Sequence, residues 1–448
     1  MKKFDKDKYL KNLKFKRNLT KYGRYFYIGV PCVLAVVAGI YFAYSKFSVF
    51  KEEEVVRTTV GDFISGDIVV GAYIDGEYSN TIPGKNDGYV VKSVSCDNNA
   101  TGSWDNDAWG IALTNMTKRT KCNIYFETKK NSVNDVINEA VNTNSSMFAS
   151  DDTDKNVRYI GKDPSNYVYF NCSDYNNPTA DTCELWRIIG VFNNVTKSDG
   201  SKENLVKIIR ADSLGNYSWD SSDSSVNNGY GVNDWTDADA MKLLNPGHDS
   251  ESIGGSLYYN AKSGTCYYGR NNATTSCDFT STGLKNDITR NAIEEVVWNL
   301  GGTDAYNTST ASMFYTAERG TTVYSGRPTT WTGKIGLMYP SDYGYATSGG
   351  TTKDRSACLA KELYNWDSSD FSDCKGNDYL YNSSLYQWTL APDSADAYYV
   401  FYVGRDGAVA SYIAGHADAV RPALFLKSNI QVDKGTGAKS DPYQLKMQ

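Results

Sequence analysis

Histidine is nearly absent from this sequence and proline is scarce: the 448 residues include 2 histidines and 10 prolines. With only His248 and His416 available, a histidine-rich metal centre is excluded. No two cysteines have the Cys-x-x-Cys spacing of a zinc or redox site, and the Gly-x-Ser-x-Gly motif of serine hydrolases is absent. No internal repeat with a period of about 20–50 residues is found, which excludes solenoids and propellers. The sequence therefore predicts no metal, no cofactor and no catalytic residue.

Charge is distributed unevenly along the chain. Residues 1–27 contain eight lysines, two arginines and two aspartates, which gives a net charge of +8. Because the whole chain has a net charge of −6, the remaining residues carry −14. An acidic body of this kind argues against nucleic acid as a partner. A basic head before an acidic body is typical of a cytoplasmic tail joined to an exported domain.

An uncharged, mostly apolar segment follows the basic head. No Asp, Glu, Lys or Arg occurs from Tyr25 to Ser45, and about 20 apolar residues span a bilayer as a helix. We therefore predict a basic cytoplasmic tail (1–27) and a single-pass signal anchor (28–47) in the lipid bilayer, with the N-terminus cytoplasmic and the rest extracellular. A cleavable signal peptide is the alternative, because Ala43-Tyr44-Ser45 is an acceptable cleavage site; the length of the apolar stretch favours the anchor.

The cysteines support an extracellular location. One of the nine, Cys32, lies in the predicted membrane segment, and the others fall into four close pairs. An even number at short spacings in an exported chain indicates local disulfides. The expected pairs are Cys96/Cys122, Cys172/Cys183, Cys266/Cys277 and Cys358/Cys374.

Patterns along the rest of the chain predict three further segments. Residues 56–130 have period-2 alternation and Gly/Asn/Asp turns, which predicts a small all-β stalk module. Residues 131–156 begin with a helical pattern and continue into a polar stretch, which predicts a helical linker. Residues 157–448 form the main domain.

The main domain is predicted to be α+β with an antiparallel sheet. Strand patterns at 157–160, 167–170, 185–192 and 205–210 precede helical patterns at 236–244, 287–300 and 353–366, and strands return from 387 to 427. Strands and helices in separate runs are typical of the α+β class.

The last sixty residues have an unusual composition. A frame of apolar and turn positions, from Trp388 to Lys427, encloses a mixture of Tyr, Ser, Asp, Gly and Ala. That mixture on strands is the composition of a binding surface, since tyrosine supplies contact area at low entropic cost. A catalytic centre needs a few groups in fixed geometry instead. The predicted ligand-binding residues are Asp396, Tyr398, Tyr399, Tyr402, Arg405, Ser411, Tyr412, His416 and Asp418.

Four phrases in the main domain resemble a family of Gram-positive surface proteins of unassigned function. They are Tyr159–Asn171, Glu184–Phe192, Gly336–Tyr345 and Val420–Lys427, in this order, and the resemblance extends over most of 157–448. The closing pattern, from Trp388 to Lys427, is similar to the C-type-lectin-like fold of the formylglycine-generating-enzyme type. This resemblance implies a lectin-like ligand-binding domain at 157–448. It does not imply the enzyme's activity, because every exported cysteine has a nearby partner and none matches the catalytic pair.

The same fold displays the variable residues of diversity-generating retroelement target proteins. In those proteins adenines near the 3′ end of the gene are rewritten, so that Asn codons scatter into residues such as Tyr, Asp, Ser and Ala. The assortment between Asp393 and Ala419 comes largely from that set. An ordinary family member with Tyr-rich loops is the alternative.

Three functions fit these observations. The preferred one is a membrane-anchored cell-surface binding or adhesion protein, not an enzyme, whose Tyr-rich C-terminal surface binds an extracellular protein or glycan. The alternative is an envelope enzyme that acts on cell-wall glycan with a carboxylate pair. The third is a structural wall protein without a specific ligand.

Overall fold

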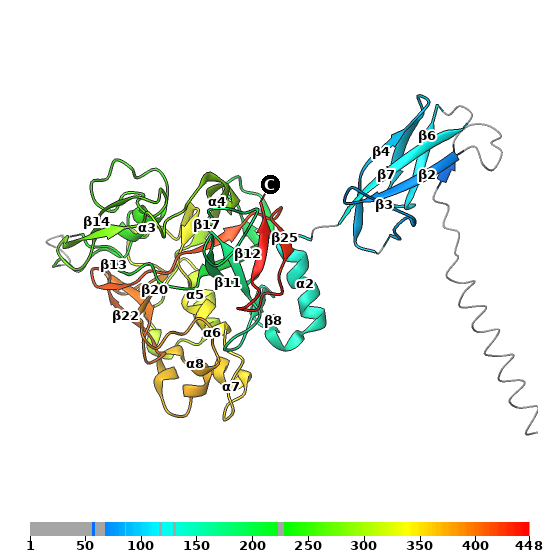
Figure 1. Ribbon diagram of the computed structural model, residues 1–448. Coiled ribbons are helices and arrows are strands. Elements are labelled where there is room, and N and C mark those ends of the chain that lie inside the picture. The colour runs from blue at the N-terminus through cyan, green and yellow to red at the C-terminus, as the bar shows by residue number, and fades with distance from the viewer. Residues whose placement is uncertain are drawn as a thin grey trace, which may run out of the picture. The chain divides into compact units, whose positions relative to one another are not determined.

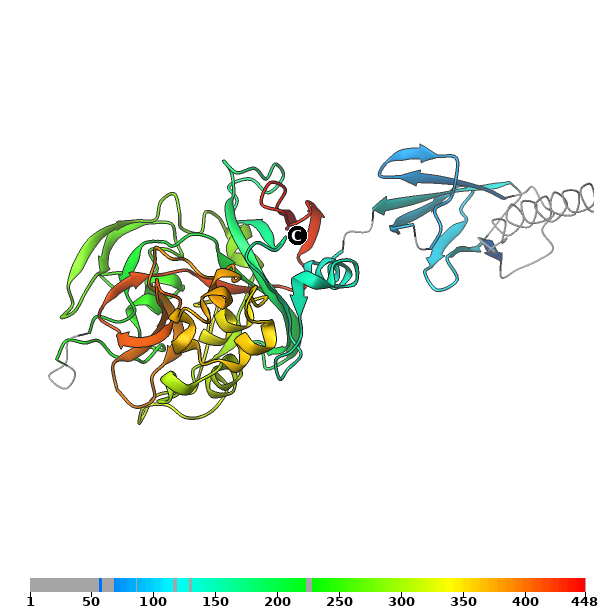
Figure 2. The ribbon, with the colours of Figure 1, turned by 90° about the horizontal axis from the view of Figure 1, so that it is seen from below.

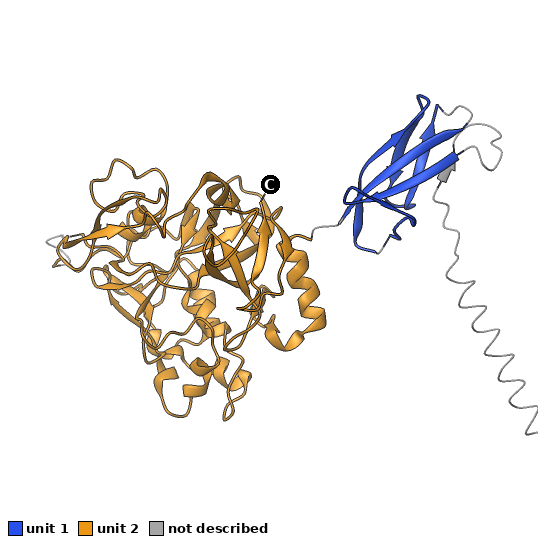
Figure 3. Ribbon diagram, viewed as in Figure 1, with its two compact units in different colours: residues 1–129 blue, residues 130–448 orange. Residues whose placement is uncertain are grey.

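The computed structural model describes residues 56–58, 68–85, 87–115, 119–128, 131–222 and 228–447. The chain divides into two compact units, Met1–Lys129 and Lys130–Gln448 (Figure 3). The described residues of each unit have their own hydrophobic core.

The described part of the first unit is built from strands. One sheet has the order β3-β2-β7-β4 and the other β1-β6-β5, and β2 and β7 pair in parallel. Ile111, Ile124 and Phe126 are buried in its core. The bounds are β1 (Val56–Thr58), β2 (Ile68–Ile74), β3 (Glu77–Ser79), β4 (Tyr89–Cys96), β5 (Thr101–Asp105), β6 (Gly110–Thr114) and β7 (Thr120–Thr128).

A mixed sheet of ten strands forms the centre of the second unit. Its main path is β16-β24-β12-β11-β10-β26-β25, with β19 paired to β24, and β9 paired to β8 and β11. Most pairs are antiparallel, but β10 and β26 are parallel. The bounds are β8 (Phe148–Ala149), β9 (Val157–Tyr159), β10 (Tyr167–Phe170), β11 (Glu184–Thr196), β12 (Lys202–Arg210), β16 (Ile293–Glu294), β19 (Ile335–Gly336), β24 (Ala423–Leu426), β25 (Gln431–Lys434) and β26 (Tyr443–Lys446).

A second sheet in this unit holds most of the C-terminal strands. Its order is β13-β23-β20-β21-β22, and β13, β20 and β22 are labelled side by side in Figure 1. Its strands are β13 (Asn216–Ser218), β20 (Gln387–Pro392), β21 (Tyr399–Val403), β22 (Val409–Ile413) and β23 (Ala417–Ala419). Two separate two-stranded sheets pair β14 (Ser263–Tyr267) with β15 (Thr274–Asp278), and β17 (Val296–Asn299) with β18 (Thr330–Gly333).

The helices of the second unit are short, and several gather beside the five-stranded sheet (Figures 1 and 2). The longest described α-helix, α2, has 11 residues. The α-helices are α2 (Val133–Thr143), α3 (Asp239–Leu244), α4 (Asp287–Ala292), α5 (Ala311–Glu318), α6 (Pro340–Tyr345), α7 (Arg355–Ala360) and α8 (Ser372–Gly376). Single turns of 3₁₀ helix are η1 (Ser145–Met147), η2 (Tyr306–Thr308) and η3 (Leu363–Asp367).

The segment 131–156, predicted as a helical linker, is part of the second unit, and its helix α2 packs against that unit's core. Ser132 and Asp135 form a capping box at its N-terminus, and Val133 and Ile137 are buried. The Val133 N–H also donates to the Ile430 carbonyl at 3.0 Å.

The predicted fold class, α+β with a transmembrane helix, a β module and a C-type-lectin-like α+β domain, is wrong for the described residues, which are mostly β-sheet with few helices. The predicted membrane anchor at 28–47 lies outside the described residues. Among the residues that the structure describes, no helix has the length and apolar character needed to cross a membrane.

The segment 287–300 shows why the helical content was overestimated. It was predicted as one helix, but α4 ends at Ala292 and the chain continues as strands β16 and β17. Ile293 pairs with Leu426 of β24, and Trp298 pairs with Trp331 of β18. β-Branched and aromatic residues are stiff in a helix and pack well on a sheet, so tertiary pairing outweighs the helical spacing.

The predicted disulfides are confirmed. All four pairs are bonded: Cys96–Cys122, Cys172–Cys183, Cys266–Cys277 and Cys358–Cys374.

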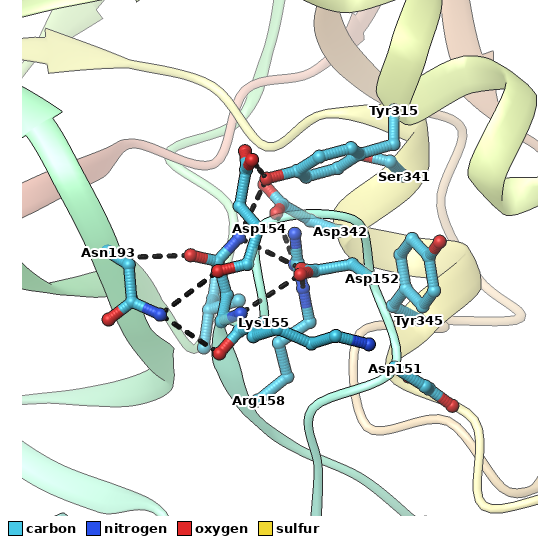
Figure 4. Close-up of polar contacts among 12 residues, drawn as sticks. Asp151, Asp152, Asp154, Lys155, Arg158, Asn193, Tyr315, Ser341, Asp342 and Tyr345 are labelled. Carbon is cyan, nitrogen blue, oxygen red and sulfur yellow. Dashed lines mark hydrogen bonds and ion pairs between the residues drawn. The ribbon is translucent and has the colours of Figure 1, made fainter.

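A buried ion network connects distant parts of the second unit (Figure 4). Arg158 of β9 donates from Nε to Asp152 Oδ2 and from Nη1 to Asp342 Oδ1, both at 2.8 Å. The other Asp342 oxygen accepts from Lys207 Nζ at 2.6 Å and from the Tyr339 N–H at 3.0 Å. The network therefore joins β9, β12 and the N-terminus of α6.

The charged forms of Asp342 and Lys207 depend on their ion-pair partners in this network. Burial alone would raise the pKa of Asp342, but Lys207 and Arg158 outweigh it and hold that pKa well below its usual range. Burial lowers the pKa of Lys207, and Asp342 opposes this shift only in part. Removing one partner would leave an uncompensated charge in a dry interior.

We predict that Asp342→Asn destabilises the second unit by about 3–5 kcal/mol, the usual cost of breaking a buried ion pair from one side. Urea unfolding of the oxidised chain, followed by tryptophan fluorescence, measures the change. Asp249→Asn is the control, because Asp249 and its partner Lys262 are both more than half exposed, and such exposed pairs contribute about 1 kcal/mol or less. Equal effects of the two variants would contradict the role of the network.

Candidate functional site

The nine predicted binding residues lie on one continuous stretch, from the loop before β21 to β23. The structure separates them into two groups. Tyr402, Tyr412, His416 and Asp418 line one pocket, and Arg405 lies at its edge. The others lie outside this pocket: Asp396 and Tyr398 in the loop before β21, Tyr399 at the start of β21, and Ser411 on β22.

Strand pairing explains the first group. Trp388 of β20 lies opposite Tyr402 of β21, and Val400 lies opposite Tyr412 of β22. Because side chains alternate between the two faces of a strand, Tyr402 and Tyr412 share one face. Phe401, between them, points to the other face and is fully buried.

The pocket has a volume of about 260 Å³. It is lined by Tyr386, Tyr402, Tyr412, His416 and Asp418. The rings of Tyr386 and Tyr402 meet edge to face at 5.6 Å, and those of Tyr412 and His416 at 5.1 Å. Such edge-to-face pairs are favourable arrangements of aromatic rings.

Exposure differs sharply among the lining residues. The fractional exposure is 46% for Tyr412 and 38% for Tyr386, but only 5% for Asp418. Tyr402 is partly buried and packs beside Trp388, with ring centroids 6.4 Å apart. The pocket therefore has open aromatic walls and a recessed carboxylate.

Tyr386 was missed by the sequence prediction, whose frame began at Trp388. It lies two residues before Trp388, so strand alternation extended by two residues would have placed it on the same face. The guanidinium of Arg405 lies 4.8 Å from the centroid of the Tyr386 ring. This contact places Arg405 at the rim of the pocket.

Burial and nearby charges shift the pKa values of Asp418 and Tyr402 in the pocket. Burial raises the pKa of Asp418, and His416, whose Nδ1 lies 3.1 Å from Asp418 Oδ1, offsets that shift only in part. Burial, followed by the negative charge of Asp406, raises the pKa of Tyr402 to about 12. Tyr402 is therefore a neutral hydroxyl at physiological pH.

The second group is organised by Asn233. Its side-chain amide donates to the carbonyl oxygens of Asp393, Asp396 and Tyr399 at 2.9, 2.7 and 3.0 Å. The Ser411 hydroxyl donates to Asp393 Oδ2 at 3.0 Å. Ser411 therefore helps to hold the loop before β21.

Two tyrosines of the second group form an aromatic cluster. Tyr398 contacts Tyr399 at 4.9 Å and Tyr230 at 5.2 Å between ring centroids. Tyr230 was also missed, and it stands beside Arg270, whose guanidinium is 4.1 Å from its ring centroid. No local sequence pattern connects Tyr230 to Tyr398, because more than 160 residues separate them.

Several contacts hold the β21–β22 hairpin in place. The Tyr343 hydroxyl of α6 donates to the Gly407 carbonyl at 2.9 Å, and the Tyr381 hydroxyl donates to the Arg405 carbonyl at 2.6 Å. Gly407 has φ +87°, and a Cβ there would lie 2.2 Å from Lys375. The turn therefore requires glycine at this position.

Another cavity, of about 240 Å³, opens beside the buried network, and Lys207, Arg319 and Asp154 are among its lining residues. Its charged groups already have partners within the protein. Lys207 pairs with Asp342, and Arg319 Nε lies 3.7 Å from Asp154 Oδ2. The Tyr315 hydroxyl donates to the same Asp154 oxygen at 2.6 Å (Figure 4).

Carboxylates also approach each other at Asp220 and Asp239. Burial, followed by the charge of Asp220, raises the pKa of Asp239 to about 7. Asp220 accepts from the Val232 N–H at 2.6 Å and Asp239 from the Ser221 N–H at 2.7 Å. Neither residue lines the tyrosine pocket. Within the described ranges, no three His, Cys, Asp or Glu residues are grouped in a way that could hold a metal ion.

Comparisons with known proteins leave this geometry as the basis for function. No family model matches the chain, and neither a curated protein nor a solved structure matches it.

We predict that Asp239 makes the protein less stable as pH rises from about 4 to about 7. Its pKa is higher in the folded chain than the ordinary aspartate value of 3.8, so in this range the unfolded chain releases a proton that the folded chain retains. Asp239→Asn removes this dependence. As pH rises across the window, the unfolding free energy of the variant should therefore increase relative to that of wild type by roughly 2–4 kcal/mol.

Urea unfolding at a series of pH values measures this difference. Asp278→Asn is the control: hydrogen bonds from Thr280 lower the pKa of exposed Asp278, so its contribution is lost only as pH falls below about 4. Parallel curves for Asp239→Asn and wild type would contradict the assignment.

Proposed function

We propose that this chain is a membrane-anchored cell-surface binding protein whose ligand enters the pocket formed by Tyr386, Tyr402, Tyr412, His416 and Asp418. One observation carries the proposal: exposed aromatic side chains and a recessed carboxylate converge on a pocket of about 260 Å³. Concave sites with aromatic walls and few polar groups are typical of ligand binding.

The construction of the pocket suits binding. Tyr402 lies on β21, Tyr412 on β22 and Asp418 on β23. The opposite face of β21 and β22 is anchored by buried Phe401, Val403 and Val409. Tyrosine on a rigid frame loses little rotamer entropy when a ligand binds. Its hydroxyl adds hydrogen bonding to the apolar contact of the ring.

Three observations support the extracellular, membrane-anchored part of the proposal. Residues 25–45 are uncharged and mostly apolar, and residues 1–27 carry a charge of +8. The four disulfides are stable in an oxidising compartment outside the cytoplasm. A protein facing outward from the membrane is positioned to bind an extracellular protein or glycan.

Retroelement diversification of residues 393–419 stays a prediction. Tyr402, Tyr412, His416 and Asp418 lie in this stretch and line the pocket, so changes there would alter ligand choice directly. A near-copy of these codons downstream of the gene, differing at adenines and followed by a reverse transcriptase, would support it.

We predict that Tyr412→Ala abolishes ligand binding and changes the free energy of unfolding by about 0.5 kcal/mol or less, as is usual for exposed side chains. Arrays of glycans and extracellular proteins, probed with the full-length chain, measure binding, and thermal unfolding measures stability. Tyr268→Ala is the matched control, because Tyr268 is 47% exposed and lies next to the β14–β15 hairpin, outside the pocket.

Retained binding in Tyr412→Ala would overturn the proposal. So would an equal loss of binding in Tyr268→Ala. Activity on purified cell wall that is lost in Asp220→Asn or Asp239→Asn would support the enzyme alternative instead.

A further inference from the structure

Asp418 is the most buried residue of the tyrosine pocket. Its side chain is 7% exposed, and it pairs with His416, whose imidazole is charged only when protonated. His416 itself is half exposed and contacts only the Oδ1 atom. The carboxylate is therefore largely removed from bulk water, and the permanent positive charge that acts on it is the more distant Arg405 at the rim.

The walls around this carboxylate are aromatic. Tyr386, Tyr402 and Tyr412 line the same pocket as Asp418. The face of an aromatic ring attracts cations, and desolvation strengthens the attraction. Arg405 already uses this property at the rim, where its guanidinium lies 4.8 Å from the Tyr386 ring centroid.

Carboxylates contribute a negative field at the pocket, which Arg405 at the rim opposes in part. After burial, the charges of Asp406 and Asp418 both contribute to raising the pKa of Tyr402. Beyond residue 27 the chain carries a net −14. A negative field attracts positively charged ligands and accelerates their association.

We infer that the pocket binds an organic cation, an ammonium or quaternary ammonium group, seated between the tyrosine rings and paired with Asp418. This inference rests on the proposed function and names the chemical class of its ligand. A neutral ligand would cover the Asp418 carboxylate without supplying a counter-charge, at a desolvation cost that a cation offsets. The volume of about 260 Å³ admits a cationic head group rather than a large ligand.

Small probes of matched shape test the inference. Choline and its neutral isostere 3,3-dimethylbutan-1-ol differ in one charge, and titration of the full-length chain by calorimetry or NMR compares them. We expect choline to bind at least tenfold more tightly than the isostere. We expect Asp418→Asn to weaken choline binding at least tenfold and to leave binding of the isostere unchanged.

A third probe, n-butylammonium, distinguishes the source of the cation. Tighter binding of n-butylammonium than of choline points to a primary amine, such as a lysine side chain of a partner. Tighter binding of choline points to a quaternary head group. Either result supports the inference, provided that Asp418→Asn weakens the binding.

Tyr402→Leu and Tyr412→Leu together provide a second test that leaves Asp418 in place. They keep apolar volume but remove the rings, so choline binding should fall at least tenfold. Equal binding of choline and the isostere, or choline binding unchanged in both tests, would overturn the inference.

Failure of the cation inference can be distinguished from failure of the proposed function. If Tyr412→Ala abolishes binding on the arrays while choline does not bind, the pocket is a ligand site for a neutral group. If Tyr412→Ala has no effect on the arrays, the proposed function itself fails.

Discussion

The second unit depends on one physical constraint, the complete pairing of charges around Arg158. Arg158, Lys207 and Asp342 are each almost fully buried, and each would be costly alone. Asp342, at the N-terminus of α6, pairs with both cations at once, and Asp152 supplies a second negative charge to Arg158. Asp342 is thereby held within hydrogen-bond distance of Arg158, 184 positions away in the sequence, and of Lys207, 135 positions away. The position of α6 is the structural consequence, because this helix cannot move without separating buried charges.

Helix α6 carries this constraint toward the tyrosine pocket. The carbonyl of Met338, just before α6, accepts from the Leu390 N–H of β20 at 2.9 Å. Tyr343 donates to Gly407 at the turn between β21 and β22. The helix thus holds both a strand and the hairpin that bear the pocket, while the pocket's own face stays open to solvent. Phe401, Val403 and Val409 on the opposite face are fully buried, whereas Tyr412 on the pocket's face is 46% exposed, so Tyr412 can vary without loss of the core.

Local signals in the sequence predicted some features and failed for others. Short cysteine spacings predicted all four disulfides, and the Tyr-rich mixture after Trp388 included four of the five residues that line the pocket. The fold class was wrong because helical spacing at 287–300 ignored strand partners in β18 and β24. Tyr230 and the Arg158 network could not be predicted, since their partners lie far away along the chain. Separation of the nine residues into two groups also required the pairing of β20, β21 and β22.

The central claim is that the outer face of this sheet is the contact surface. Nitration of tyrosines in the folded chain, mapped by mass spectrometry with and without the ligand found on the arrays, tests it most directly. We expect Tyr412 and Tyr386, which are 46% and 38% exposed, to react in the free protein and to be protected by the ligand. Tyr258 and Tyr343, both fully buried, should stay unmodified in either state. Reaction of the buried tyrosines at a similar rate, or no protection of Tyr412 and Tyr386, would contradict the account.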